Sequence, residues 1–371
     1  MGSAKVCLIT LLTFIVIACA GPRPTATSGS FFEPGETTDF TFESNGIELS
    51  GIFDTPKDRP AEALILFVHG YGGTDIRANQ SFGDLRRRFA EIGIASAVWD
   101  KPGQGRSEGS FDINQSVYDS AQEVVDAAKT LRGMNAPGAG KIGIWGISRA
   151  GWIAPLAMEQ DPELDFWISV SGVIGEDNFP YLVLSNLPHE GGSFEEAAKL
   201  SSEWQDGCAL QRTGAPYDAY LEATKTLRAN AYILQMRGPW QTREQYEAQQ
   251  SVCANATCDG IDDTYCSYIY VPDFDETLSA VNADVLALFG EKDLNVDWRR
   301  TRALYEQTIA ENPRATLTVH TFPDADHNLH IAETGSLQEM LTMISRQKSS
   351  GYYDLQIAWL EAHVLQDQDA K

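Results

Sequence analysis

Positive charge is scarce in this chain of 371 residues. Its 28 lysines and arginines are outnumbered by 52 aspartates and glutamates, which gives a formal net charge of −24. Binding a nucleic-acid backbone requires a basic surface, so this balance argues against a nucleic-acid partner. Apolar residues make up 43% of the chain, which is enough for a sizeable core. At this length we expect one large unit with an insertion, or two domains.

Several ligand-binding motifs are missing as well. There is no H-E-x-x-H zinc motif, and Gly140-Lys141 lacks the remaining residues of a phosphate-binding P-loop. The segment Gly103-x-Gly105-x-x-x-Gly109 has one residue too many for a dinucleotide loop and follows a strand without opening a helix. The sequence therefore predicts neither a cofactor nor a metal.

No apolar run reaches the roughly 20 residues that a membrane-spanning helix needs. The longest, from Val6 to Ala20, follows Lys5 and ends in small residues, as a secretion signal does. Val16-Ile17-Ala18-Cys19 resembles a bacterial lipobox, in which Cys19 becomes the lipidated first residue, whereas Ala18-Cys19-Ala20 also fits ordinary cleavage. We expect a leader over 1–20, a linker over 21–36 and an exported protein, more readily a periplasmic or cell-surface lipoprotein than a freely secreted one.

Cysteine is also rare. Outside the leader only four remain, all in one stretch: Cys208, Cys253, Cys258 and Cys266. An even set in an oxidising compartment predicts two local disulfides. Zinc is the alternative, but the spacing lacks paired C-x2-C knuckles and no histidine lies among the cysteines.

The chain begins with two alternating segments, 38–43 and 47–53, which predict a hairpin across Asn45-Gly46. Continuous apolar runs follow, as in strands buried on both faces of a parallel sheet. They lie at 63–68, 94–99, 141–145, 166–170 and 285–289, with a last strand at 316–322.

Helical patterns alternate with these runs, at 81–92, 117–131, 149–159 and within 336–364. This alternation predicts an α/β fold with a mostly parallel, doubly wound sheet. The interval 174–280 has no convincing buried strand and is too long for a loop. We therefore expect a core over 37–173 and 281–371, interrupted by a mainly helical cap over 174–280 that contains the four cysteines.

The best candidate for chemistry is Ser148. It lies in Gly146-Ile147-Ser148-Arg149-Ala150-Gly151, between a predicted strand and a predicted helix. Small residues two before and two after a serine allow the sharp turn of a nucleophile elbow, although Ala150 replaces the last glycine of G-x-S-x-G. The alternative is a serine that only caps the helix.

A serine nucleophile needs a base and an orienting acid, and in this architecture they follow in the order Ser, acid, His. We assign Asp293 as the acid and His327 as the base, because each follows a late strand. Glu291 and Asp297 are the other candidates for the acid, and His330 is the alternative base. Asp326 is interpreted as a solvated loop charge.

An oxyanion needs N–H donors already in place. We expect these to be the backbone N–H groups of Arg149, after the nucleophile, and of Tyr71, in the glycine-rich loop after the third strand. His69 in that loop is interpreted as a structural hydrogen-bonding residue.

Together these segments resemble the α/β-hydrolase superfamily, and within it the lidded bacterial serine esterases and prolyl-oligopeptidase-like members. The segments are His69-Gly70-Tyr71-Gly72, Asp100 to Gly109, the turn around Ser148, Gly290-x-x-Asp293 and Asp326-His327. The resemblance covers about 40–174 and 280 to the C-terminus. In such families the loop from Asp100 to Gly109 is a structural fingerprint, so it is given no catalytic role.

The leading hypothesis is a carboxylesterase that cleaves small-molecule esters through an acyl-enzyme on Ser148. A peptidase or amidase of the prolyl-oligopeptidase type would use the same three residues. A non-catalytic surface-binding lipoprotein would be expected to have lost one of them, and none is lost. The expected cap would select the substrate, with Trp204 and Trp240 as candidate wall residues, although such aromatics more often pack within the cap itself.

Overall fold

The computed structural model describes residues 32–78, 82–113, 115–175, 178–237, 240–247, 271 and 273–366. The leader, Cys19 and most of the linker lie outside this range, as do Cys253, Cys258 and Cys266. Within the described residues, no helix is both long and apolar enough to cross a membrane.

Eight strands form one sheet in the order β1-β2-β4-β3-β5-β6-β7-β8. Their bounds are β1 Thr37–Ser44, β2 Ile47–Asp54, β3 Ala63–Val68, β4 Ile94–Trp99, β5 Ile142–Ile147, β6 Leu164–Val170, β7 Asp284–Gly290 and β8 Thr316–Phe322. β1 and β2 are antiparallel, β2 pairs antiparallel with β4, and all other pairs are parallel. The predicted strands are thus confirmed, with shifts of a residue or two at their ends.

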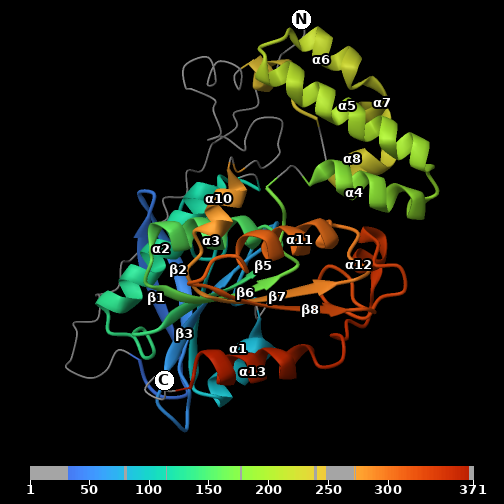
Figure 1. Ribbon diagram of the computed structural model, residues 1–371. Coiled ribbons are helices and arrows are strands. Elements are labelled where there is room, and N and C mark those ends of the chain that lie inside the picture. Colours follow the sequence, from blue (N-terminus) through green and yellow to red (C-terminus); the bar gives the residue numbers. More distant parts are fainter. Residues whose placement is uncertain are drawn as a thin grey trace, which may run out of the picture. The chain divides into compact units, whose positions relative to one another are not determined.

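Helices cover both faces of the sheet (Figure 1). One face carries α1 (Gly83–Glu91) and α13 (Tyr352–His363), and the other carries α2 (Val117–Gly133), α3 (Ala150–Gln160), α10 (Phe274–Ser279) and α11 (Trp298–Thr308). The sheet is therefore doubly wound, and the α/β-hydrolase fold expected from the sequence is confirmed.

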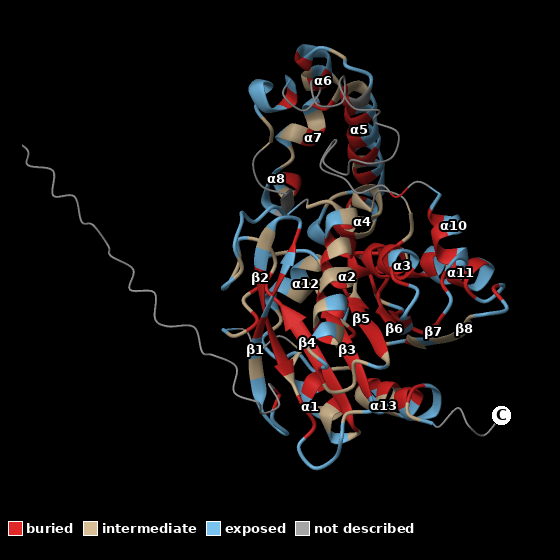
Figure 2. Cartoon of the chain, turned by 90° about the vertical axis from the view of Figure 1, so that its left-hand side faces the viewer, coloured by how far each residue is buried: buried red, intermediate tan, exposed pale blue. Residues whose placement is uncertain are grey.

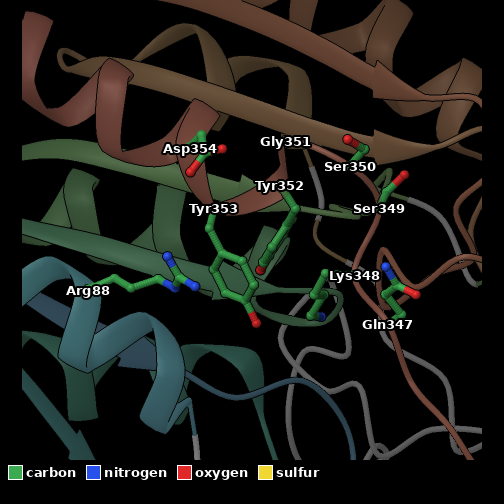
Figure 3. Close-up of a pocket in the computed structure, with 9 residues that line it drawn as sticks. All are labelled: Arg88, Gln347, Lys348, Ser349, Ser350, Gly351, Tyr352, Tyr353 and Asp354. Carbon is green, nitrogen blue, oxygen red and sulfur yellow. The ribbon is translucent and has the colours of Figure 1, made fainter.

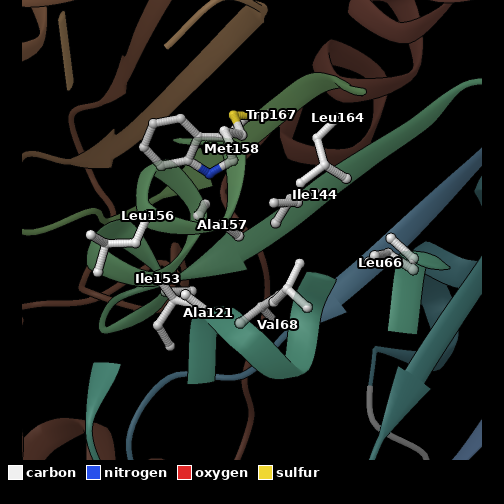
Figure 4. Packing of buried hydrophobic residues seen from close by; sticks show 14 of the residues in the cluster. Leu66, Val68, Ala121, Ile144, Ile153, Leu156, Ala157, Met158, Leu164 and Trp167 are labelled. Atoms are coloured by element: carbon white, nitrogen blue, oxygen red, sulfur yellow. The ribbon is translucent and has the colours of Figure 1, made fainter. Parts of the chain in front are cut away.

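The continuous apolar strands are explained by burial on two sides. All six residues of β3 are buried, and the central strands are the most buried part of the molecule (Figure 2). Alternate side chains point to opposite faces. Leu66 and Val68 therefore pack with α2 and α3 (Figure 4), whereas Ile65 and Phe67 belong to the cluster beneath α1 and α13.

The regular elements that the structure describes between β6 and β7 are all helices, joined by turns and irregular segments. The helices are α4 (Phe179–Asn186), η1 (Leu187–Glu190), α5 (Phe194–Arg212), α6 (Tyr217–Ala223), α7 (Lys225–Ala229), α8 (Ala231–Arg237) and α10. Several of them share a small apolar cluster that includes Val183, Leu200 and Trp204. In contrast, Phe274 and Leu278 of α10 belong to the main core. That the inserted helices act as a cap over the active site stays a prediction.

Of the four cysteines in this insertion, one lies within the described residues and three lie outside them. Cys208 is buried in α5, and its three expected partners lie outside the described residues. The predicted disulfides therefore stay a prediction. Between β8 and α13 the structure has one further helix, α12 (Leu337–Thr342).

Candidate active site

Ser148 occupies the turn between β5 and α3. Its φ is +57°, a left-handed conformation that a non-glycine residue adopts only when its surroundings impose it. The Ser148 N–H donates to the carbonyl of Val170 at 2.9 Å, and the Ser148 carbonyl accepts from Gly151 N–H at 2.7 Å. The strained turn is thus held from both sides, as in a nucleophile elbow.

The small residues around Ser148 are required by close packing. A Cβ placed on Gly146 would lie 2.7 Å from the Cβ of Ala150, and one on Gly151 would lie 2.8 Å from the backbone nitrogen of Val173. Ala150 is accommodated because Gly146 opposite it has no side chain. The departure from G-x-S-x-G therefore leaves the turn intact.

Asp293 and His327 form a buried pair. Asp293 follows β7, His327 follows β8, and the Asp293 Oδ2 atom lies 2.8 Å from Nδ1 of His327. The other carboxylate oxygen, Oδ1, accepts the backbone N–H groups of Asn295 at 2.8 Å and Val296 at 3.0 Å. Asp293 is 1% exposed and His327 is 7% exposed, so the pair is held in a fixed orientation away from solvent.

The nucleophile turn and the histidine loop are attached to the same end of β6. Val170 accepts the Ser148 N–H, and the hydroxyl of the next residue, Ser171, donates to the His327 carbonyl at 2.7 Å. No hydrogen bond joins the Ser148 hydroxyl to the His327 imidazole among the described contacts. In unliganded enzymes such bonds are often long and tighten only when substrate binds.

The pKa of His327 is the balance of opposing effects. Burial by itself lowers this pKa, but the charge of Asp293, the hydrogen bond to it and the charge of Asp326 together raise the pKa above the usual 6.5. The imidazolium that forms when a histidine accepts a proton is therefore favoured here, as general-base catalysis requires.

The structure corrects the interpretation of Asp326. It is 1% exposed rather than solvated, and its Oδ1 atom accepts the backbone N–H groups of Asn328 at 2.8 Å and His330 at 2.9 Å. Asp326 shapes the turn that carries His327. From the sequence, a charged residue in a short loop is expected to face solvent. Here the carboxylate is buried because it accepts hydrogen bonds from backbone N–H groups of its own turn.

His330, the alternative base, is held in another way. It forms an isolated β-bridge with Lys348. Burial, with the nearby charges of Lys348 and Arg346, lowers the pKa of His330 to about 4. Asp293 pairs with His327 rather than with His330.

The competing acids have other partners. The Asp297 carboxylate accepts the backbone N–H of Arg300 at 3.2 Å and thereby caps α11. The Glu291 carboxylate accepts the hydroxyl of Thr321 at 3.0 Å in an exposed position.

The glycine-rich loop after β3 lies against Ser148. A Cβ on Gly70 would be 3.3 Å from the Ser148 Cβ, so the next backbone N–H, that of Tyr71, belongs to the same neighbourhood. Arg149 precedes the first residue of α3, and its guanidinium lies 5.7 Å from the centre of the Tyr71 ring. The two expected oxyanion donors thus come from segments that flank the nucleophile.

His69 in this loop is half-buried next to Phe82, with ring centres 4.9 Å apart. Burial, with the neighbouring charge of Lys101, lowers the pKa of His69 to about 3. Its Nε2 atom has no hydrogen-bond partner among the described residues. The observed contact of His69 is thus ring packing, and the expected structural hydrogen bond is not made through Nε2.

Sequence reasoning missed two polar residues that hold the site. Lys101 lies in the loop after β4, and its Nζ donates to the carbonyls of Gly70 at 2.5 Å and Gly72 at 2.9 Å. Asn186 ends α4, is fully buried, and donates to the carbonyl of Leu294 at 2.7 Å. The sequence offered one indication for Lys101, a lysine just after a predicted buried strand. It offered no indication for Asn186.

The expected wall residues behave differently from a substrate surface. Trp204 is buried and packs on Phe179 with ring centres 4.1 Å apart, and Trp240 lies 6.5 Å from Trp204 by the same measure. Both therefore contribute to packing within the insertion, which was the alternative stated for them.

A cavity of about 310 Å³ lies beside α13, and Ser148, Asp293 and His327 are not among the residues that line it. Figure 3 shows Arg88, Lys348, Tyr352 and Tyr353 around it. The Lys348 Nζ donates to the carbonyl of Asn328 at 2.5 Å, and the Arg88 guanidinium lies over Tyr353. Since Ser148 and His327 do not line this cavity, it is not the reaction site. Within the described part of the chain, no group of three or more His, Cys, Asp or Glu side chains is placed to hold a metal ion.

Comparison with known proteins agrees with the fold. The family model described as X-Pro dipeptidyl-peptidase (S15 family) matches residues 51–323. A structure of DcsB in complex with its substrate analogue is similar, with a TM-score of 0.51 and 14% identity over 89% of this chain and 100% of that one.

Two further structures have TM-scores below 0.5. The esterase Pf2001 of Pyrococcus furiosus has a TM-score of 0.48 and 14% identity over 88% of this chain and 90% of that one. The acylaminoacyl peptidase of Pyrococcus horikoshii has a TM-score of 0.47 and 16% identity over 89% of this chain and 41% of that one. No curated protein matches the chain.

Proposed function

Because the chain belongs to the X-Pro dipeptidyl-peptidase (S15) family of α/β hydrolases, we propose that it is a serine hydrolase that cleaves carboxylic esters through an acyl-enzyme on Ser148. The observation that carries the proposal is the buried 2.8 Å contact between Asp293 and His327. Both the histidine loop and the strained turn of Ser148 are tied to the end of β6.

In the proposed reaction, the Ser148 hydroxyl attacks the substrate carbonyl while His327 Nε2 takes its proton. Asp293 holds the imidazole in the required tautomer and stabilises the imidazolium. The N–H groups of Tyr71 and Arg149 donate to the oxyanion. His327 then gives the proton to the leaving alcohol. In the second half, His327 takes a proton from water as the water attacks the acyl-enzyme, the bond between the acyl group and Ser148 Oγ breaks, and the proton returns to Ser148 as the acid leaves.

The test is hydrolysis of short-chain p-nitrophenyl esters by the purified protein. We expect Ser148→Ala to lower kcat about 10⁴-fold or more, since the nucleophile of a triad acts as one unit with its base. Ser350→Ala, at an exposed serine, is the matched control and should leave kcat unchanged. Full activity of the Ser148 variant would contradict the mechanism.

A peptidase or amidase is the second candidate, and the family match favours it. The same groups would act, but an amine leaves less readily than an alcohol and depends more on proton donation by His327. The comparison is kcat/KM for p-nitrophenyl esters against aminoacyl-prolyl p-nitroanilides. A higher kcat/KM for the anilides than for the esters would favour the peptidase over the esterase.

We also propose, from the sequence, that the protein is exported and that its leader, with Cys19 as the candidate lipid-bearing residue, attaches it to a membrane. The partner is a small-molecule substrate, and the proposed chemistry uses only side chains and backbone of the chain itself. Neither a nucleic acid nor a cofactor is part of the proposal.

A further inference from the structure

Lys101 crosses from one loop to another at the edge of the sheet where Ser148 lies. Its backbone N–H donates to the Thr74 hydroxyl at 2.9 Å, which fixes the start of the side chain. Its Nζ then donates to the carbonyl of Gly70 at 2.5 Å and to that of Gly72 at 2.9 Å. One ammonium group therefore holds the loop on both sides of Tyr71.

The bond to Gly70 has a directional consequence for Tyr71. The Gly70 carbonyl and the Tyr71 N–H belong to the same planar peptide unit, and the described chain contains no cis peptide bond. In a trans unit the C=O and N–H point in opposite directions. An ammonium group that fixes the Gly70 oxygen thus also fixes the direction of the Tyr71 N–H.

We infer that Lys101 is a positioning residue that aims the Tyr71 N–H at the oxyanion formed during acyl transfer on Ser148. This inference rests on the proposed function. A charged donor makes a stronger hydrogen bond than a neutral one, and withdrawing charge from the Gly70 oxygen also makes the N–H of the same peptide a better donor. Lys101 thereby acts through the backbone without touching substrate.

The loop that Lys101 holds packs closely on the nucleophile turn. A Cβ on Gly70 would lie 3.2 Å from the carbonyl oxygen of Ile147, so the two segments meet at a point where a side chain would be crowded. Gly72 has a φ of +93°, a conformation that favours glycine.

The groups around Lys101 act on its pKa in opposite directions. Burial and the nearby Arg149 lower the pKa of Lys101 to about 8, while the carboxyl of Glu123 raises it. Glu123 is buried in α2 and accepts the indole N–H of Trp99 at 3.2 Å and the side-chain amide of Gln115 at 2.5 Å. Lys101 is therefore mainly charged at neutral pH, which the inferred role requires.

The test compares two variants. Lys101→Met has a side chain of similar length but no hydrogen-bond donor, whereas Lys101→Arg keeps the positive charge and can still donate to the Gly70 and Gly72 carbonyls. We expect the methionine variant to lower kcat for a p-nitrophenyl ester about 10- to 100-fold, somewhat less than the loss of a whole oxyanion donor. KM should change less than about threefold, because the hole acts on the transition state. The arginine variant should recover most of the loss. Lys129→Met, at an exposed lysine of α2, is the matched control.

A second readout separates positioning from mere support of the fold. An aryl boronic acid binds serine hydrolases as a tetrahedral adduct, so its affinity for the methionine variant should fall in proportion to kcat/KM. Thermal unfolding of each variant checks the fold. If Lys101→Met does not fold, Lys101→Gln removes the charge but keeps a neutral amide donor, and its kcat and boronic acid affinity should fall in the same direction by a smaller factor.

Wild-type kcat and boronic acid affinity in a folded Lys101→Met protein would overturn the inference. A drop in kcat with unchanged boronic acid affinity would also overturn it. If instead Ser148→Ala keeps full activity, the proposed function itself fails, whatever the lysine variants do. The two failures are therefore distinguishable.

Discussion

At the scale of single residues, the charge of Asp326 acts on the histidine next to it. Asp326 is one of the two carboxylates whose charges raise the pKa of His327, against a burial effect that lowers it. Only the neutral imidazole can accept a proton from Ser148. Activity should therefore rise with pH as His327 loses its proton, and the midpoint should lie above pH 6.5.

Asp326→Asn should move this rise to lower pH, because the variant removes a charge that stabilises the imidazolium. The asparagine oxygen can still accept the two backbone N–H groups that Asp326 Oδ1 accepts now. The measurement is kcat/KM for an ester between pH 5 and 9. Glu333→Gln, which removes an exposed charge nearby, should leave the profile in place. A profile of Asp326→Asn that is unshifted or moved to higher pH would contradict the assignment.

The same pKa has a consequence for stability. Since the pKa of His327 is raised in the folded chain, the protonated histidine stabilises the fold below about pH 6.5, its unfolded value. This contribution is lost as the pH rises through the folded-state pKa. The neutral His327 imidazole that catalysis needs therefore forms only at pH values where the protonated histidine no longer stabilises the fold.

At the scale of elements, the contact between β5 and α3 decides whether Ser148 can take its strained conformation. Gly146 at the end of β5 lies where a Cβ would come within 2.7 Å of the Ala150 Cβ at the start of α3. Strand and helix can approach this closely only if one of these two residues has no side chain.

Gly146→Ala should therefore lower the free energy of unfolding by about 1–3 kcal/mol through overpacking. Ala150→Gly alone should cost at most about 1 kcal/mol. The double variant Gly146→Ala with Ala150→Gly should regain much of the loss, since the two sites are coupled. Denaturant unfolding of the four proteins measures this cycle. Purely additive effects would show that the contact is not limiting.

At the scale of the whole molecule, the insertion is attached to the loop that carries the acid. Polar side chains of α4 and its flank bond to three successive carbonyls of that loop: Tyr181 to Asp293, Asn186 to Leu294, and Asn178 to Asn295. Asn186 also accepts the backbone N–H of Leu337 at 2.6 Å. The insertion and the active-site loops are thus parts of one hydrogen-bonded unit.

Asn186→Ala should cost about 1–3 kcal/mol of stability, because it removes the acceptor of the Leu337 N–H and one of the two side-chain donors to the Leu294 carbonyl, the other being the Ser185 hydroxyl. It should also lower kcat, since Asp293 lies in the loop that is released. Gln338→Ala, an exposed amide on α12, is the control for both measurements. A variant that loses stability but keeps full kcat would show that the attachment supports the fold and not the acid.

Much of this protein could be predicted from its sequence, because the relevant signals are local. Periodicity located all eight strands, and small residues around Ser148 identified the turn. Asp293 and His327 were found by their order after late strands, and the structure places them 2.8 Å apart. The export signal and the disulfides remain predictions, because Cys19, Cys253, Cys258 and Cys266 lie outside the described residues.

The sequence by itself thus determined the α/β-hydrolase architecture and the turn of Ser148, because strand periodicity and close backbone packing act between neighbours in the chain. Only the tertiary structure decided the environment of that turn. Asp326 is buried rather than solvated, Lys101 reaches the loop of Gly70, and Asn186 reaches the loop of Asp293. The contacts of Lys101 and Asn186 join residues 31 and 108 positions apart. Their partners are backbone carbonyls, which every residue carries, so no side-chain pattern in the sequence can predict them.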